Sequence, residues 1–172
     1  RKIATSETAE TAVAVEEQYD RAGRLISIRE NADGDFVETT YGYDVGNRLK
    51  QVSTGIQSRF FNYDLRGLLT SEQHPESGTT SYEYDSRGNV VQRTTGLPQT
   101  LTYEYDQAER LRFVRTGGSV LKEFTYDTAA GAGNGKVASA IRHNRDTDLG
   151  ADVVIAESYV YSGKGGRLSA KT

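Results

Sequence analysis

The carboxylates between residues 146 and 157 have the residue types and part of the spacing of a calcium loop. Asp146, Asp148, Asp152 and Glu157 stand at relative positions 1, 3, 7 and 12 of that template, and carboxylate oxygens are ligands that Ca²⁺ prefers. The template requires glycine at position 6, where this chain has Ala151. These residues are therefore metal candidates that depart from the pattern, and a solvated loop between two strands is the alternative.

Other chemistry-bearing residues form no complete site. The stretch Gly131-Ala-Gly-Asn-Gly-Lys136 is followed by Val137, where a phosphate-binding loop needs Ser or Thr, so an extended turn is expected. His74 and His143 have no nucleophile or ligand partner at a recognisable spacing. Cysteine is absent. We therefore assign no catalytic residue, expect no cofactor, and predict that the chain is not an enzyme.

A Tyr-Asp pair recurs at a nearly constant interval. Successive copies are 24, 20, 21, 21 and 21 residues apart, and a degenerate seventh copy follows at Tyr161-Ser162. A fixed period of this length indicates a repeat architecture, in which neighbouring units bury surface against each other. The six regular copies are Tyr19-Asp20, Tyr43-Asp44, Tyr63-Asp64, Tyr84-Asp85, Tyr105-Asp106 and Tyr126-Asp127.

Each of the first five pairs is followed by the residues of a tight turn. Three residues after the aspartate stands Gly23, Asn47, Gly67 or Gly88, although the fifth copy has Glu109 there. An Asp carboxylate accepts backbone N–H groups two residues on, and Gly or Asn tolerates positive φ. The aspartate therefore has a structural use in the turn before any reaction is considered.

Arginine accompanies the aspartate in the first five copies. It follows four residues later as Arg24, Arg48 or Arg110, and two residues later as Arg66 or Arg87. We hypothesise an alternating Asp/Arg rim that specifies register, because exposed pairs contribute only about 0–1 kcal/mol each. Ordinary charge mixing on a turn is the alternative.

A second aromatic stands two residues before the motif tyrosine in every copy but the first. This spacing places both rings on one face of a strand. Evenly spaced rings could stack on sugars, whereas cross-strand packing between repeats is the favoured alternative. The candidates are Tyr41, Phe61, Tyr82, Tyr103, Phe124 and Tyr159.

Strands and turns must position all of these residues. A second Gly-containing turn lies midway between successive pairs, so each unit reads as two strands and two turns. This predicts an all-β fold of tandem antiparallel β-hairpins that form a long, curled meander sheet, with almost no helix. The expected strands cover 13–19, 25–30, 36–43, 49–53, 57–63, 69–73, 79–84, 90–94, 99–105, 111–115, 119–126, 137–144 and 153–161.

The repeat array is expected over residues 13–172, with long turns or loops at 128–136 and 145–152. Residues 1–12 are expected to be an N-terminal extension, for which disorder is one option. Only 35% of residues are hydrophobic, which suits a single sheet layer. The net charge of −3 with interspersed signs disfavours nucleic acid as a partner, and no apolar run is long enough for a membrane span.

The motif resembles the YD repeat of Rhs proteins, of the shell components of insecticidal toxin complexes, and of teneurins. The resemblance covers about residues 15–172, and the matching segments are Tyr19-Asp-Arg-Ala-Gly-Arg-Leu25, Tyr43-Asp-Val-Gly-Asn-Arg-Leu49 and Tyr82-Glu-Tyr-Asp-Ser-Arg-Gly-Asn-Val90. It implies a partial β-shell within a larger secreted or cell-surface bacterial protein that encloses a toxin or other polypeptide cargo. The self-cleavage motif of Rhs-type shells contains Asp-Pro, which is absent here, so that activity is not carried over.

The partners expected from this interpretation are neighbouring repeats of the parent protein. Both end strands of the array would have an open edge, so edge-to-edge self-association is the other option. The alternative function is a carbohydrate- or cell-surface-binding adhesion module built from the same repeats, with glycans as partners.

Overall fold

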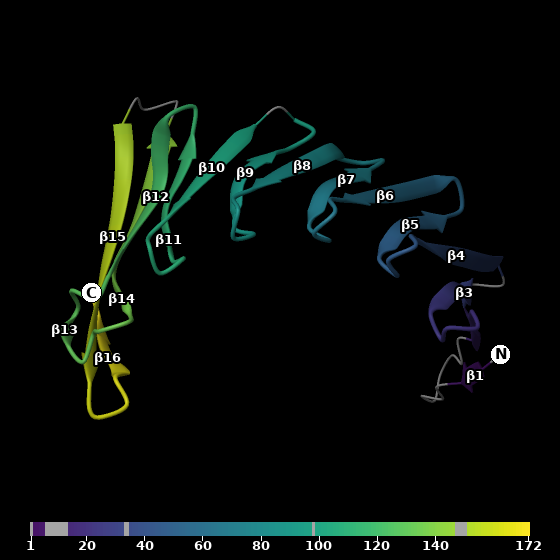
Figure 1. Cartoon of the computed structure of the whole chain (residues 1–172), viewed down its shortest axis with the longest axis horizontal. Coiled ribbons are helices and arrows are strands. Elements are labelled where there is room, and N and C mark those ends of the chain that lie inside the picture. The colour runs from purple at the N-terminus through teal and green to yellow at the C-terminus, as the bar shows by residue number, and fades with distance from the viewer. Residues whose placement is uncertain (1, 6–13, 33–34, 98, 147–150) are drawn as a thin grey trace. The chain divides into compact units, whose positions relative to one another are not determined.

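The computed structural model describes residues 2–5, 14–32, 35–97, 99–146 and 151–172 (Figure 1). Every regular element within these residues is a β-strand. The predicted all-β fold of antiparallel hairpins in a meander sheet is therefore confirmed. In the described part of the chain, no helix has the length and apolar character needed to cross a membrane.

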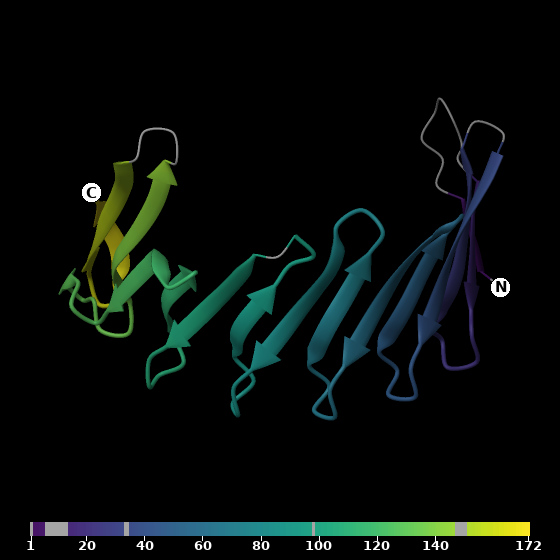
Figure 2. The same cartoon turned by 90° about the horizontal axis from the view of Figure 1, so that it is seen from above.

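The chain divides into two compact units. The first comprises residues 1–81 and 95–97, and the second comprises residues 82–94 and 98–172. In the first unit each strand pairs with the next one in the sequence, so that the strands lie side by side (Figure 2). Its strands are β1 (Lys2–Thr5), β2 (Ala14–Tyr19), β3 (Leu25–Ala32), β4 (Asp35–Tyr43), β5 (Leu49–Thr54), β6 (Gln57–Tyr63), β7 (Leu69–His74) and the first part of β8 (Gly78–Tyr84).

The second unit continues the meander from the last residues of β8. Its strands pair antiparallel except for β13, which runs parallel to β15. The strand β15 also pairs with β14 and β16. The elements are β9 (Val90–Thr94), β10 (Thr100–Tyr105), β11 (Leu111–Thr116), β12 (Ser119–Tyr126), β13 (Ala130–Gly131), β14 (Val137–Asp146), β15 (Ala151–Ser162) and β16 (Arg167–Lys171).

Three strands, β1, β13 and β16, were not expected from the sequence. β1 lies within the range expected to be an extension, and it pairs antiparallel with β2 from Lys2–Glu17 to Thr5–Ala14, which covers the open edge of that strand. Residues 6–12 of the extension and 147–150 of the second loop lie outside the described residues. β13 lies inside the loop expected at 128–136.

The motif tyrosine marks a register shift in its hairpin. Tyr126, for example, pairs with Val137, whereas Thr125 before it pairs with Ser139. The same shift occurs before Tyr19, Tyr43, Tyr63, Tyr105 and Tyr161. Such bulges bend a strand locally and re-aim its side chains, so the repeat places the tyrosine in the same backbone setting each time.

Burial is shallow in both units. Among the described residues, the buried apolar side chains are Val114 and Ala138, each 7% exposed. Ser27 and Thr80 are the buried polar residues in the same part of the chain. Since so little apolar surface is enclosed, hydrogen bonds and ion pairs between repeats carry more of the specificity of the fold than a hydrophobic core does.

Candidate functional site

The turn at Asp106 illustrates the geometry of the Tyr-Asp motif. Asp106 Oδ1 accepts the backbone N–H groups of Ala108 at 2.9 Å and Arg110 at 3.0 Å, and Oδ2 accepts Arg110 Nε at 2.7 Å. The backbone closes the same turn, since Asp106 N–H donates to Arg110 C=O at 2.9 Å and Glu109 N–H donates to Asp106 C=O at 3.0 Å. Both carboxylate oxygens are therefore engaged within the turn.

The other short turns repeat this geometry. In all five, Oδ1 of the aspartate accepts the N–H groups two and four residues on, at 2.8–3.0 Å. The N–H four residues on is the largest cause of the lowered pKa of Asp20, Asp44 and Asp64. For Asp85 and Asp106, the side chain four residues on lowers the pKa most.

The residue three positions after the aspartate has a left-handed backbone in every short turn. Gly23, Gly67 and Gly88 adopt φ values of 81°, 88° and 96°, and Asn47 adopts 62°. Glu109 takes φ 63° at the same position, where a residue with a Cβ pays a steric cost. The fifth turn therefore keeps the conformation of the glycine turns with a less suitable residue.

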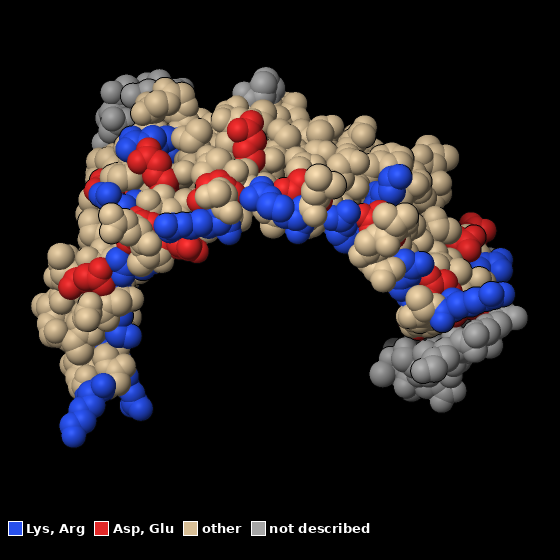
Figure 3. All heavy atoms as spheres, in the orientation of Figure 1, with Lys and Arg blue, Asp and Glu red and all other residues tan. Residues whose placement is uncertain are grey.

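The cations predicted beside the aspartates lie at the turns. Arg24, Arg48 and Arg110 donate Nε to the aspartate four residues earlier at 2.6–2.7 Å, and Arg66 Nε donates to Asp64 Oδ2 at 2.9 Å. Figure 3 shows basic and acidic side chains next to each other along the border that carries these turns.

The fourth copy differs from the others. The amide of Asn89 donates to Asp85 Oδ2 at 3.1 Å, so a neutral side chain stands where three other copies have arginine. Arg87 instead reaches forward to the next turn, where it contacts Gln107 C=O at 3.4 Å and Glu109 at 3.5 Å.

The motif tyrosine joins each repeat to the one before it. In the second unit, Tyr126 donates its hydroxyl to Leu111 C=O at 2.7 Å, and Tyr105 donates to Val90 C=O at 2.9 Å. The first unit has the same bonds, each 2.8 Å long, from Tyr43 to Leu25 and from Tyr63 to Leu49. The acceptor is always the aliphatic residue five positions after the preceding aspartate, a link that the sequence analysis missed.

The arginine of one turn also contacts the tyrosine of the next. The guanidinium of Arg110 lies 4.3 Å from the centroid of the Tyr126 ring, and its Nη atoms donate to Asp127 at 3.0 and 2.7 Å. Hydrogen bonds from Asp127 and Asp106 raise the pKa of the Arg110 guanidinium. The pairs Arg24–Tyr43 and Arg48–Tyr63 repeat the stack, each at 4.8 Å.

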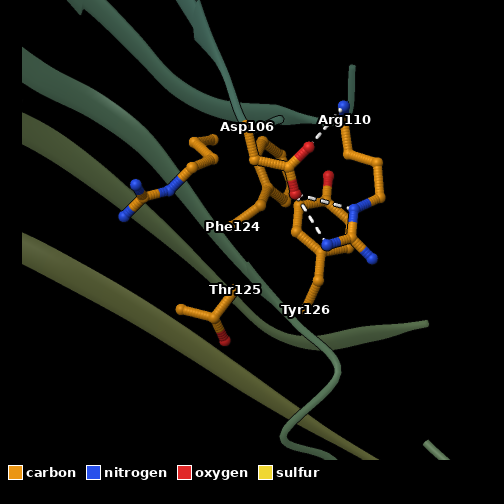
Figure 4. Close-up of a pocket in the computed structure, with 6 residues that line it drawn as sticks. Asp106, Arg110, Phe124, Thr125 and Tyr126 are labelled. Atoms are coloured by element: carbon orange, nitrogen blue, oxygen red, sulfur yellow. Dashed lines mark hydrogen bonds and ion pairs between the residues drawn. The ribbon is translucent and has the colours of Figure 1, made fainter. Parts of the chain in front are cut away.

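A wedge-shaped opening separates adjacent repeats next to these contacts. Pairing between β11 and β12 ends at Phe113–Glu123, three residues before Tyr126, and pairing between β9 and β10 ends three residues before Tyr105, at Gln92–Thr102. We call each opening a wedge and name it by its tyrosine. The Tyr126 wedge holds a cavity of about 280 Å³ (Figure 4) and the Tyr105 wedge one of about 340 Å³.

The sixth turn is longer but closes in the same way. Asp127 N–H donates to Lys136 C=O at 2.9 Å, and Asp127 Oδ1 accepts Gly135 N–H at 2.7 Å. Lys136 Nζ lies 5.4 Å from the centroid of the Tyr161 ring. Lys136 and Tyr161 thus occupy the places that Arg110 and Tyr126 occupy one repeat earlier.

The seventh copy is more complete than the sequence suggested. Tyr161 pairs with Leu168 and Ser162 with Arg167, after a register shift at the tyrosine. Gly166 precedes Arg167 and has φ 55°, as the third turn residue of a regular copy would. Gly166-Arg167-Leu168 therefore completes the motif, and one additional turn residue had moved it out of the expected spacing.

The aromatics proposed for sugar stacking lie within the sheet. The Phe61 and His74 rings meet edge to face with centroids 6.2 Å apart, and Tyr103 stands opposite Val114. All six are half-buried: Tyr41, Phe61, Tyr82, Tyr103, Phe124 and Tyr159. Half-buried rings of this kind offer only part of their faces to a ligand.

The structure does not bring the metal candidates together. Asp148 and the side chains of Asp146 and Asp152 lie outside the described residues. Glu157 accepts the Tyr159 hydroxyl at 2.6 Å and pairs with Lys171 Nζ at 2.7 Å, and Lys171 is the main cause of its lowered pKa. Among the residues that the structure describes, no group of three His, Cys, Asp or Glu could hold a metal ion.

Comparison with known proteins places the fold among shell proteins. Residues 4–132 match the family model described as teneurin YD-shell. A crystal structure of TcdB2-TccC3 without its hypervariable C-terminal region is similar with a TM-score of 0.70 and 17% identity, covering 94% of this chain and 9% of that chain. A second TcdB2-TccC3 crystal structure gives 0.66 and 16%, with coverages of 94% and 9%.

A structure of the Photorhabdus luminescens Tc holotoxin pore gives a TM-score of 0.58 and 17% identity, covering 93% of this chain and 10% of that chain. The chain thus spans about a tenth of the length of these solved relatives. No curated protein matches it.

Proposed function

Because the chain belongs to the teneurin YD-shell family, we propose that it forms part of the wall of a β-shell in a larger protein. The observation that supports this most is the pair of contacts that recurs between repeats. A tyrosine hydroxyl bonds to the carbonyl of the repeat before it, and an arginine stacks on the tyrosine of the repeat after it. Such contacts join successive hairpins into a continuous wall.

The wall is proposed to enclose a polypeptide cargo. The solved relatives are toxin-complex proteins by their titles, and one title names a hypervariable C-terminal region. We place the parent protein among secreted or cell-surface bacterial proteins for the same reason. The role is structural rather than enzymatic, since the recurring carboxylates are bonded within their own turns.

Protease protection of the cargo tests this function. The full-length parent protein would carry Arg110→Gln, which removes the bonds to Asp106 and Asp127. The matched control is Arg115→Gln, which removes a single 2.7 Å pair with Glu104 across one hairpin. We expect the C-terminal part of the parent to be digested faster in Arg110→Gln than in the control. Equal digestion of this part in the wild type and after deletion of the repeats would contradict enclosure.

The adhesion alternative is not favoured, because the six candidate aromatics are half-buried in the sheet. Saturable quenching of tyrosine fluorescence by an oligosaccharide would reverse this judgement.

A further inference from the structure

The backbone of the motif tyrosine forms an unpaired edge in the regular wedges. Alternate residues of a strand direct their N–H and C=O groups to opposite edges. Asp127 donates its N–H across the hairpin to Lys136, so Tyr126 directs its own N–H and C=O toward β11. The β11–β12 register ends at Phe113–Glu123, so β11 supplies no backbone partner at that point.

Tyr105 is placed in the same way. Asp106 donates its N–H across the hairpin to Arg110, and the β9–β10 register ends at Gln92–Thr102. The tyrosine hydroxyl does not remove this opening. It satisfies the carbonyl of the preceding repeat and leaves the N–H and C=O of the tyrosine itself available.

The chain fills one of its own wedges with a short strand. At Tyr161, β13 adds parallel to β15, with Ala130 opposite Val160 and Gly131 opposite Tyr161. Ala132 N–H donates to Tyr161 C=O at 2.9 Å. The backbone of Tyr161, which corresponds to that of Tyr126, is therefore paired by a segment of small residues.

The residue in register with the tyrosine has to be glycine. A Cβ atom on Gly131 would lie 2.0 Å from Tyr161 O, and the residue has φ +77°. Both the close approach and the left-handed backbone exclude larger residues. A ligand that pairs in this way is therefore selected by one glycine at a defined position.

The regular wedges have room for a comparable segment. The cavities of about 280 and 340 Å³ lie near the lower end of the range for small-ligand pockets, about 300 Å³. The Tyr126 wedge is lined by Phe124 and Thr125 from β12 and by Asp106, Arg110 and Arg112 beside it (Figure 4). It therefore offers a strand edge, part of an aromatic face and charged groups at its border.

We propose that the Tyr105 and Tyr126 wedges bind an extended segment of a second polypeptide by parallel β-addition, with a glycine in register with the motif tyrosine. Main-chain hydrogen bonds supply the affinity in this mode of recognition, and close side-chain positions supply the specificity. The proposal rests on the geometry of the wedges and is independent of what the shell encloses.

An NMR titration of the isotopically labelled full chain tests the proposal. The probe is a capped peptide with the sequence of residues 128–134, Thr-Ala-Ala-Gly-Ala-Gly-Asn. We expect saturable shifts of the Tyr105 and Tyr126 amide signals. Because few hydrogen bonds are gained, a dissociation constant on the order of 1 mM is expected.

Two control peptides separate strand addition from adhesion to the surface. One carries alanine in place of the residue equivalent to Gly131, and the other carries an N-methyl group at the residue equivalent to Ala132. Each should bind about tenfold or more weakly, because a clash is introduced or a hydrogen bond is lost. Equal binding of all three peptides would overturn the proposal. So would shifts confined to Tyr161, no shift at all, or saturation of the same signals by an oligosaccharide instead of the peptide.

Discussion

The turns of copies five and six reach the same end with different lengths of chain. Asp106 bonds through its N–H to the residue four positions on, and Asp127 to the residue nine positions on. In both, a left-handed residue precedes the cation, Glu109 at φ 63° and Gly135 at φ 78°. Both cations then lie over the tyrosine of the next copy. The repeat thus conserves the contact to its neighbour rather than the path of the turn.

What differs is the element that spans the wedge. Beyond copy five, the Tyr126 hydroxyl spans it and bonds to Leu111. Beyond copy six, β13 spans it and pairs with Tyr161, whose hydroxyl has no hydrogen bond among the described residues. A side chain and a short strand are therefore two solutions to the same opening between repeats.

The largest effect is expected from the aspartates. Asp106→Ala leaves two backbone N–H groups of its turn without an acceptor, and unsatisfied groups are costly. Asp127 accepts one backbone N–H and is 43% exposed, against 17% for Asp106. Asp106→Ala should lower the midpoint of thermal unfolding by several degrees and Asp127→Ala by less. The reverse order would contradict the difference drawn between the two turns.

Acid should weaken the same turn. The Arg110 side chain, followed by its backbone N–H, lowers the pKa of Asp106, so the folded state binds this proton less readily than the unfolded state. The stabilisation is present above about pH 4 and is lost as the pH falls through the depressed pKa. Urea unfolding at several pH values should show a shallower acid decline for Asp106→Asn than for the wild type. Parallel curves would show that Asp106 contributes nothing to it.

Gly131→Ala should disrupt the strand that fills the Tyr161 wedge. The new Cβ would meet Tyr161 O, and a forced clash of this kind costs about 1–3 kcal/mol. Gly135→Ala is the matched control, since Gly135 also has a positive φ of 78° but nothing lies within 4 Å of its Cβ position. The free energy of unfolding should fall further for Gly131→Ala. Equal losses would attribute the effect to backbone strain alone.

Tyr126→Phe should destabilise the chain by about 1 kcal/mol, because one buried-side hydrogen bond to a carbonyl is lost. Tyr161→Phe should leave the free energy of unfolding unchanged, since β13 spans that wedge. Chemical denaturation of the two variants measures the difference. A comparable loss in both would mean that the hydroxyls serve the two wedges alike.

The smallest effect is expected at Glu109. Glu109→Gly relieves a left-handed backbone, and after the entropy cost of glycine it should stabilise the chain by about 0.5 kcal/mol. Gly88→Ala, the converse change at φ 96° in copy four, should destabilise it. Thermal unfolding would decide between these signs, and stabilisation by both changes would refute the argument from φ.

The strands and the role of the aspartate could be predicted because they depend on local chemistry. Gly23 or Asn47 tolerates the left-handed turn, and the nearby carboxylate accepts N–H groups only a few residues away. The tyrosine link could not be predicted, because its acceptor is a backbone carbonyl that any residue type carries. β13 was missed for a related reason, since its partner is the open backbone of Tyr161, 30 residues from Gly131.

Native-state hydrogen exchange tests most directly whether the tyrosine and arginine contacts couple neighbouring repeats. In repeat proteins, coupling between units makes neighbouring units open together. Amides of β10–β11 and of β12–β14 should exchange through a common opening in the wild type. They should exchange with separate opening free energies when Arg110→Gln and Tyr126→Phe are combined. A common opening that persists in the double variant would contradict the account.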